Sequence, residues 1–122
     1  MPELSPSAAR VLVVEDEYML ADALADGLTA LGVQVVGPVG GLEEALALAA
    51  ESELDGAILD INLGGETVFP LADALVARGV PYVFATGYGR DSIPEPYRGA
   101  PILSKPVDVA ALKSLLETAA SS

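Results

Sequence analysis

The sequence predicts an α/β fold, in which a parallel sheet carries helices on both of its faces. Short apolar runs alternate with longer stretches in which apolar residues recur at helical spacing, and this alternation continues along the chain. The apolar runs contain no polar alternation, which is typical of strands buried on both faces. Because crossovers between parallel strands are right-handed, we expect one doubly wound sheet built from about five strand–helix units.

Three strands and two helices are predicted in the first half of the chain. The first helix carries leucines at helical spacing (Leu20, Leu24, Leu28 and Leu31), and Gly32 is a suitable residue to end it. The second helix is rich in alanine and leucine, both strong helix formers. In chain order, the elements are the strand Arg10–Val14, the helix Tyr18–Leu31, the strand Val33–Gly37, the helix Leu42–Glu51 and the strand Gly56–Asp60.

The second half is predicted to continue in the same order. Thr67 is placed to cap a third helix, Pro70 is tolerated in its first turn, and Gly79 ends it. Asp108 is placed to cap a last helix. In chain order, the elements are the helix Thr67–Arg78, the strand Val80–Ala85, the strand Pro101–Ser104 and the helix Asp108–Ala119.

The segment Gly87–Gly99 interrupts this order where a fourth helix is expected. It contains three glycines and two prolines. In a helix, an interior glycine costs about 1 kcal/mol and an interior proline about 3 kcal/mol. We therefore expect an irregular fourth helix, with at most one short helical turn in a mobile segment.

The composition excludes several classes of function. The chain has no cysteine and no histidine, so it cannot form a disulfide, a thiolate or imidazole nucleophile, or a zinc site with those ligands. Its net charge of −12 disfavours binding to nucleic acid. No apolar run is long enough to span a membrane, and residues 1–9 do not resemble a signal peptide. We expect a cytoplasmic domain at residues 10–120 that follows a flexible tail.

Polar residues stand at the ends of four predicted strands. Glu15 and Asp16 follow the first strand, Asp60 ends the central one, Thr86 follows the fourth and Lys105 follows the fifth. The carboxyl ends of parallel strands meet at one edge of a sheet, where open α/β folds bind ligands, so we expect these side chains to lie together. Asp60 alone could be a loop-start cap and Lys105 a solvated lysine, but the combination favours chemistry.

Clustered carboxylates repel one another, and a divalent cation would hold them ionised. The oxygen ligands favour Mg²⁺, with Mn²⁺ as the alternative. We expect Asp16 and Asp60 to bind the metal directly and Glu15 to act through a water or as a charge partner. The backbone carbonyl of Asn62 is placed to complete the protein ligands.

Phosphoryl transfer to Asp60 fits these residues. The transition state is loose and carries its charge on the equatorial phosphoryl oxygens. The metal would neutralise one of these oxygens, Lys105 a second, and the Thr86 hydroxyl would donate to a third. Asp60 would supply the attacking oxygen, as carboxylates do in aspartyl-phosphate chemistry.

Four segments at the ends of successive strands resemble the receiver domain of bacterial two-component response regulators. They are Val11–Glu17, Ile58–Asn62, Phe84–Tyr88 and Ser104–Pro106. Each segment is a weak signal alone, but four in this order at matching strand ends are specific. The segment Phe84–Tyr88 also looks like the FATGUY subgroup of receivers, which are often single-domain response regulators.

The resemblance implies a flavodoxin-like (βα)5 fold with strand order 2-1-3-4-5. It also implies that a sensor histidine kinase phosphorylates Asp60, that Mg²⁺ binds to Asp16, Asp60 and the carbonyl of Asn62, and that a cis peptide precedes Pro106. The protein would be a phosphoacceptor rather than an enzyme, with slow autodephosphorylation at most. Its partners would be the kinase and a downstream protein, such as a histidine phosphotransfer protein, with no nucleic acid and no membrane.

The chain departs from the receiver pattern at the switch residue. Many receivers carry an aromatic residue three positions before the lysine, where this chain has Ile102, and we expect Tyr88 to take over that role. Two other functions stay open. One is a receiver-like binding module that does not depend on phosphorylation. The other is a Mg²⁺-dependent phosphatase, although such enzymes generally carry a second acid where this chain has Asn62.

Overall fold

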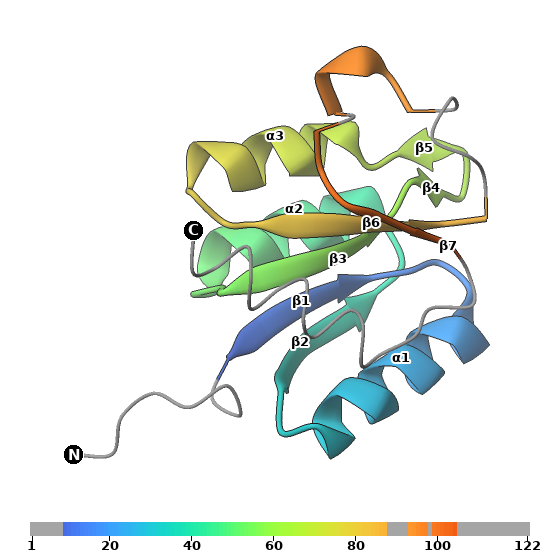
Figure 1. Cartoon of the computed structure of the whole chain (residues 1–122), viewed down its shortest axis with the longest axis vertical. Coiled ribbons are helices and arrows are strands. Elements are labelled where there is room, and N and C mark those ends of the chain that lie inside the picture. The colour runs from blue at the N-terminus through green and yellow to red at the C-terminus, as the bar shows by residue number, and fades with distance from the viewer. Residues whose placement is uncertain (1–8, 88–92, 98, 105–122) are drawn as a thin grey trace.

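A computed structural model of the protein describes residues 9–87, 93–97 and 99–104. It shows a five-stranded parallel sheet flanked by helices (Figure 1). The strands of this sheet are β1 (Arg10–Val14), β2 (Gln34–Val39), β3 (Gly56–Asp60), β6 (Tyr82–Thr86) and β7 (Ile102–Ser104). The described helices are α1 (Tyr18–Ala30), α2 (Leu42–Glu51), α3 (Phe69–Ala77) and the 3₁₀-helix η3 (Glu95–Tyr97).

The order of the sheet is β2-β1-β3-β6-β7, and every pair of neighbours is parallel. Because β6 and β7 are the fourth and fifth strands of this sheet, the predicted order 2-1-3-4-5 and the flavodoxin-like fold are confirmed. β3 lies in the middle, and all its residues are buried. A strand covered on both faces requires an unbroken apolar run, which the sequence provides up to Asp60.

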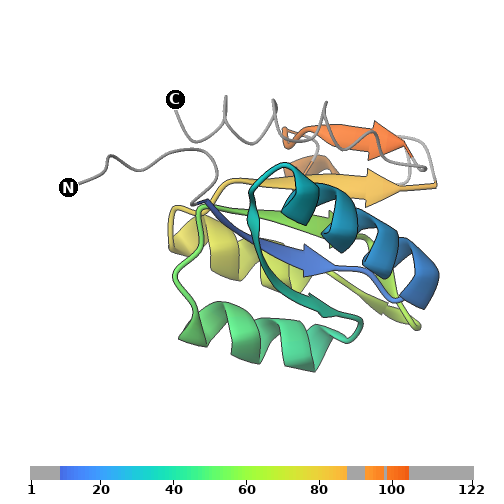
Figure 2. The same cartoon turned by 90° about the horizontal axis from the view of Figure 1, so that it is seen from below.

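Helices cover both faces of the sheet, and each face has its own apolar core (Figures 1 and 2). Successive side chains of a strand point to opposite faces, so each strand contributes to both cores. The core beneath α1 contains Val11, Val13, Leu24, Leu28, Ile58 and Val83. The core beneath α2 and α3 contains Leu12, Val14, Ala45, Ala49, Leu59, Leu71, Leu75 and Phe84.

The apolar stripe of α1 differs at its ends from the predicted one. Ala21, Leu24 and Leu28 are buried, whereas Leu31 is the C-terminal cap and is 37% exposed. Gly32 follows with a φ of 87°, which is the left-handed conformation that favours glycine at a helix end. The leucine spacing therefore predicted the helix, but its last leucine lies past the turn that faces the core.

A small antiparallel hairpin between β3 and α3 was not predicted. It consists of β4 (Asn62–Leu63) and β5 (Glu66–Thr67), and Asn62 lies opposite Thr67. Thr67 was expected to cap the third helix, and this expectation was wrong because pairing with Asn62 places Thr67 in a strand. α3 begins instead after Val68, without a side-chain cap and with a proline in its first turn.

The connection from β6 to β7 contains η3, in the segment where at most one short helical turn was predicted. Ile93 is fully buried, and the ring of Tyr97 stacks on Phe69 with a centroid distance of 4.5 Å. The Tyr97 hydroxyl also donates to Asp73 Oδ1 at 2.9 Å. Since Phe69 and Asp73 both belong to α3, these contacts attach the connection to that helix.

Several predictions fall outside the described residues and stay predictions. They concern residues 1–8 of the tail, Tyr88, Lys105, Pro106 and the last helix, Asp108–Ala119. Within the described part, a cis peptide joins Gly37 to Pro38. No helix in that part combines the length and the apolar character that crossing a membrane would require.

Candidate phosphoacceptor and metal site

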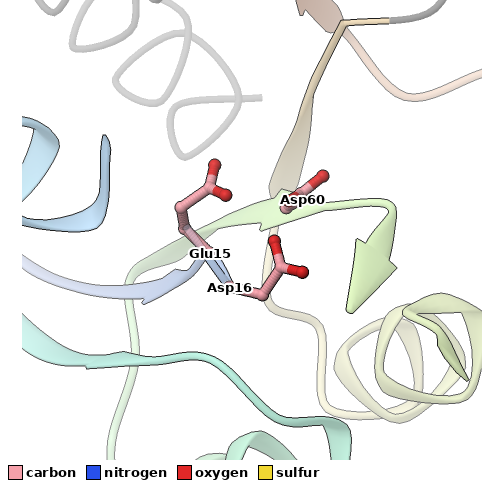
Figure 3. A group of neighbouring side chains, drawn as sticks. All are labelled: Glu15, Asp16 and Asp60. Atoms are coloured by element: carbon pink, nitrogen blue, oxygen red, sulfur yellow. The ribbon is translucent and has the colours of Figure 1, made fainter. Parts of the chain in front are cut away.

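Three carboxylates gather at the carboxyl edge of the sheet (Figure 3). Glu15 and Asp16 follow β1, Asp60 ends β3, and these two strands are hydrogen-bonded neighbours. One oxygen from each carboxylate lies within 4.8 Å of the others. Glu15 and Asp60 are 5% and 7% exposed, whereas Asp16 faces solvent. The parallel topology therefore brings together acids that lie far apart in the sequence.

Main-chain hydrogen bonds fix the loop that carries the first two acids. The N–H of Glu15 donates to the carbonyl of Val39 at 3.0 Å, and the N–H of Glu17 donates to Glu15 Oε2 at 3.0 Å. The N–H of Gly64, in another loop, donates to Asp16 Oδ2 at 3.1 Å. Both carboxylates of this loop thus accept a hydrogen bond from the backbone.

Thr86 ends β6, the strand next to β3, and is only 1% exposed. The register pairs Asp60 with Ala85, so Thr86 lies one residue further toward the same edge. On its other side Thr86 pairs with Ser104, and Lys105 is the next residue in the sequence. Lys105 and Tyr88 lie outside the described residues, and their roles at the site stay predictions.

Asn62 begins β4 and is exposed. Its Oδ1 accepts a hydrogen bond from the N–H of Gly65 at 3.2 Å, so the side chain takes part in the turn. Its backbone carbonyl remains the predicted ligand. The main-chain N–H of Gly64 was not among the predicted site groups, although a Gly-Gly pair between two short runs is a known signal for a hairpin.

The set of donor atoms suits a hard divalent cation. All three side chains present carboxylate oxygens, which Mg²⁺ and Ca²⁺ take as ligands in proteins. Two of the three carboxylates are buried, and the close approach of three like charges favours a bound positive charge between them. Glu15, Asp16 and Asp60 therefore fit a metal ion of this class.

Two tyrosines near α3 have raised pKa values. The hydrogen bond from the Tyr97 hydroxyl to Asp73 raises the pKa of Tyr97 above the usual 10.0. Burial, and then the charge of Asp73, raise the pKa of Tyr82 above the same value. The folded protein therefore favours the protonated phenols at both positions.

Comparison with known proteins identifies the family. No protein-family model matches the chain. The solution structure of SdrG from Sphingomonas melonis Fr1, a single-domain response regulator, has a TM-score of 0.82 and 40% sequence identity, over 98% of this chain and 100% of SdrG. The chain belongs to the response regulator receiver family.

Other receivers show similarity along most of the chain. A response regulator from Burkholderia pseudomallei, solved with a phosphorylated aspartic acid, a calcium ion and citrate, is 28% identical, with a TM-score of 0.80 over 93% of this receiver and 69% of that chain. The regulator PhyR of Methylorubrum extorquens is 32% identical, and PdtaR of Mycobacterium tuberculosis is 28% identical, each over 92% of this receiver. The receiver spans only 43% of PhyR and 57% of PdtaR.

Proposed function

We propose that this receiver accepts a phosphoryl group on Asp60 from a sensor histidine kinase, in a reaction that requires Mg²⁺. The observation that carries the proposal is the position of Asp60, which ends the central strand with oxygens of Glu15 and Asp16 within 4.8 Å. The protein acts as a phosphoacceptor that catalyses its own modification, and not as an enzyme that turns over a substrate.

The geometry supports a direct displacement at phosphorus. An oxygen of Asp60 forms a bond to phosphorus while the bond between phosphorus and the imidazole nitrogen of the kinase breaks. Glu15, Asp16, Asp60 and the carbonyl of Asn62 would hold the cation, and Mg²⁺ bound there would supply positive charge to the phosphoryl group. The hydroxyl of Thr86, on the neighbouring strand end, donates to a phosphoryl oxygen.

In this proposal Lys105 supplies a second positive charge for the phosphoryl group, besides that of the cation. It directly follows Ser104, which pairs with Thr86 at the carboxyl edge. In the proposed mechanism its ammonium forms an ion pair with the phosphoryl group, as lysine does in other phosphate sites. We also propose a cis peptide before Pro106, because cis bonds are essentially confined to proline.

Two relatives support the proposal. The Burkholderia pseudomallei response regulator contains a phosphorylated aspartic acid and a calcium ion. SdrG has a solution structure in a BeF3-activated conformation, which is 42% identical, with a TM-score of 0.74 over 88% of this receiver and 92% of that chain.

The proposed kinase contact includes the start of α1, where Tyr18 and Met19 are 77% and 79% exposed beside the acidic loop. The signal leaves through protein contacts or through onward transfer to a histidine phosphotransfer protein.

Labelling with acetyl phosphate tests the proposal. We expect the purified protein to gain one phosphoryl group when Mg²⁺ is present, and to gain none after chelation of the metal. Asp60→Asn removes the attacking oxygen and should abolish the mass gain while leaving the circular dichroism spectrum unchanged. Asp26→Asn on the exposed face of α1 is the matched control and should label as the wild type does. Undiminished labelling of Asp60→Asn would refute the assignment.

A further inference from the structure

We infer that the β4–β5 hairpin is a positioning element of the metal site. The hairpin acts through the main-chain N–H of Gly64, which donates a hydrogen bond to Asp16 Oδ2 at 3.1 Å. This bond holds the Asp16 carboxylate beside those of Glu15 and Asp60. The inference rests on the proposed function, because it concerns how one ligand of the proposed metal is oriented.

The hairpin is built to hold the Gly64 N–H in one place. Gly64 and Gly65 form its two-residue turn with φ angles of 62° and 95°, both in the left-handed region that such a turn requires. The N–H of Gly65 donates to Asn62 Oδ1 at 3.2 Å. Next to the turn, Leu63 is 3% exposed and belongs to the core beneath α2 and α3, so the hairpin is anchored in the interior.

Asp16 needs such a restraint more than its two neighbours do. Glu15 and Asp60 are buried, so the surrounding atoms limit their rotamers. Asp16 is exposed, and Gly40 lies against its main chain: a Cβ added at Gly40 would lie 3.3 Å from the Asp16 Cα and 3.9 Å from its Cβ. The hydrogen bond from Gly64 therefore fixes the carboxylate, while the close approach of Gly40 fixes the main chain.

The contact leaves the carboxylate able to bind metal. A carboxylate has two oxygens, and an N–H on Oδ2 leaves Oδ1 for the cation. Hydrogen-bond partners of ligating groups set the orientation of those groups, and their loss typically lowers metal affinity by roughly 10–100-fold. The Gly64 amide has this relation to Asp16, although it lies 48 residues away in the sequence.

A pair of substitutions at Gly64 isolates the effect. Gly64→Val places a β-branched residue at a positive φ, which opposes the turn and moves the N–H. Gly64→Asn is the matched control, since asparagine followed by glycine is the preferred pair for this turn and no atom lies within 4 Å of an added Cβ. Mn²⁺ alone is the probe, and electron paramagnetic resonance measures the free ion at equilibrium.

We expect Gly64→Val to bind Mn²⁺ about tenfold more weakly than the wild type, which is the lower end of the range for loss of a hydrogen bond to a metal ligand. Gly64→Asn should bind Mn²⁺ as the wild type does. Thermal unfolding of each variant confirms that it is folded. Equal affinities for all three proteins would overturn this inference and leave the proposed function intact. A wild-type protein that binds no Mn²⁺ would overturn the proposed metal site, and the inference with it.

A measurement without metal checks the hydrogen bond itself. In the wild type, the Gly64 amide should be protected from hydrogen exchange, and Asp16→Ala should remove that protection because the acceptor is gone. The Gly65 amide, which donates to Asn62, should keep its own protection in the same variant. If Asp16→Ala left the exchange of the Gly64 amide unchanged, the contact would not exist in solution.

Discussion

The β3–α3 connection and the described part of the β6–β7 connection both lie beside α3, but different kinds of contact hold them (Figure 1). The first is a hairpin closed by backbone pairing and a glycine turn, and the N–H of Val68 donates to the carbonyl of Ile61 at 2.9 Å. The second is attached through side chains, with Ile93 buried and Tyr97 stacked on Phe69.

The two kinds of contact tolerate different substitutions. Backbone hydrogen bonds depend on register and turn conformation, so most side-chain substitutions in the hairpin strands should leave them in place. Aromatic contacts depend on the rings themselves and are lost when a ring is truncated. The following substitutions should therefore disturb the β6–β7 connection and spare the hairpin.

The largest effect is expected at Phe84. This residue is fully buried and supports the ring of Phe69 edge-on, at a centroid distance of 6.0 Å. Phe84→Ala should lower the free energy of unfolding by about 3–5 kcal/mol, as other phenylalanine truncations in cores do. Urea unfolding measures the change, and Phe84→Leu, which refills most of the volume, should lose less. If Phe84→Ala kept wild-type stability, the ring would not be a core residue.

A smaller effect is expected at Tyr97. Tyr97→Ala removes the stack on Phe69 and the hydrogen bond to Asp73, so it should lower the free energy of unfolding, but by less than Phe84→Ala does. Tyr97→Phe keeps the ring and should lower the free energy of unfolding less than Tyr97→Ala does, because only the hydrogen bond is lost. Neither variant should change the hydrogen exchange of the Gly65 amide in the hairpin. Loss of that protection in Tyr97→Ala would show that the two connections are not held separately.

The smallest effect is a change in alkaline titration. The folded-state pKa of Tyr97, and that of Tyr82, lies above the unfolded value of 10.0, so folding strengthens proton binding at both phenols. Their contribution to stability is complete below pH 10 and is lost as the pH rises through the folded pKa. Asp73→Asn removes the negative charge and should lower both pKa values, as seen in the ¹³Cζ shifts of the tyrosines. Unchanged titration in this variant would contradict the assigned cause.

The sheet was predictable because its centre is buried on both faces. β3 shows no alternation, and its apolar run ends at a carboxylate, so both the strand and the place of Asp60 followed from the sequence. The hairpin was missed because β4 and β5 contain two residues each, which is too short for a period of two to appear. The Gly64-Gly65 pair forms the turn at the centre of this hairpin, with both φ angles in the left-handed region.

The sequence predicted the acidic residues of the candidate site but not the hydrogen bonds that orient them. Parallel strands bring Glu15, Asp16 and Asp60 to one edge, and this follows from topology alone. The donor to Asp16 is a main-chain amide, which leaves no side-chain signal in the sequence. The contact between Tyr97 and Asp73 depends on how η3 packs against α3, and the hydrophobic pattern of the sequence does not predict how two such elements pack.

The start of α3 joins the two connections within a single peptide unit. The N–H of Val68 donates a hydrogen bond to the carbonyl of Ile61, the residue after Asp60. Phe69, the residue after Val68, stacks its ring on Tyr97. Although separate contacts hold the two connections, Val68 and Phe69 give them a common anchor, so an insertion between these two residues should disturb both.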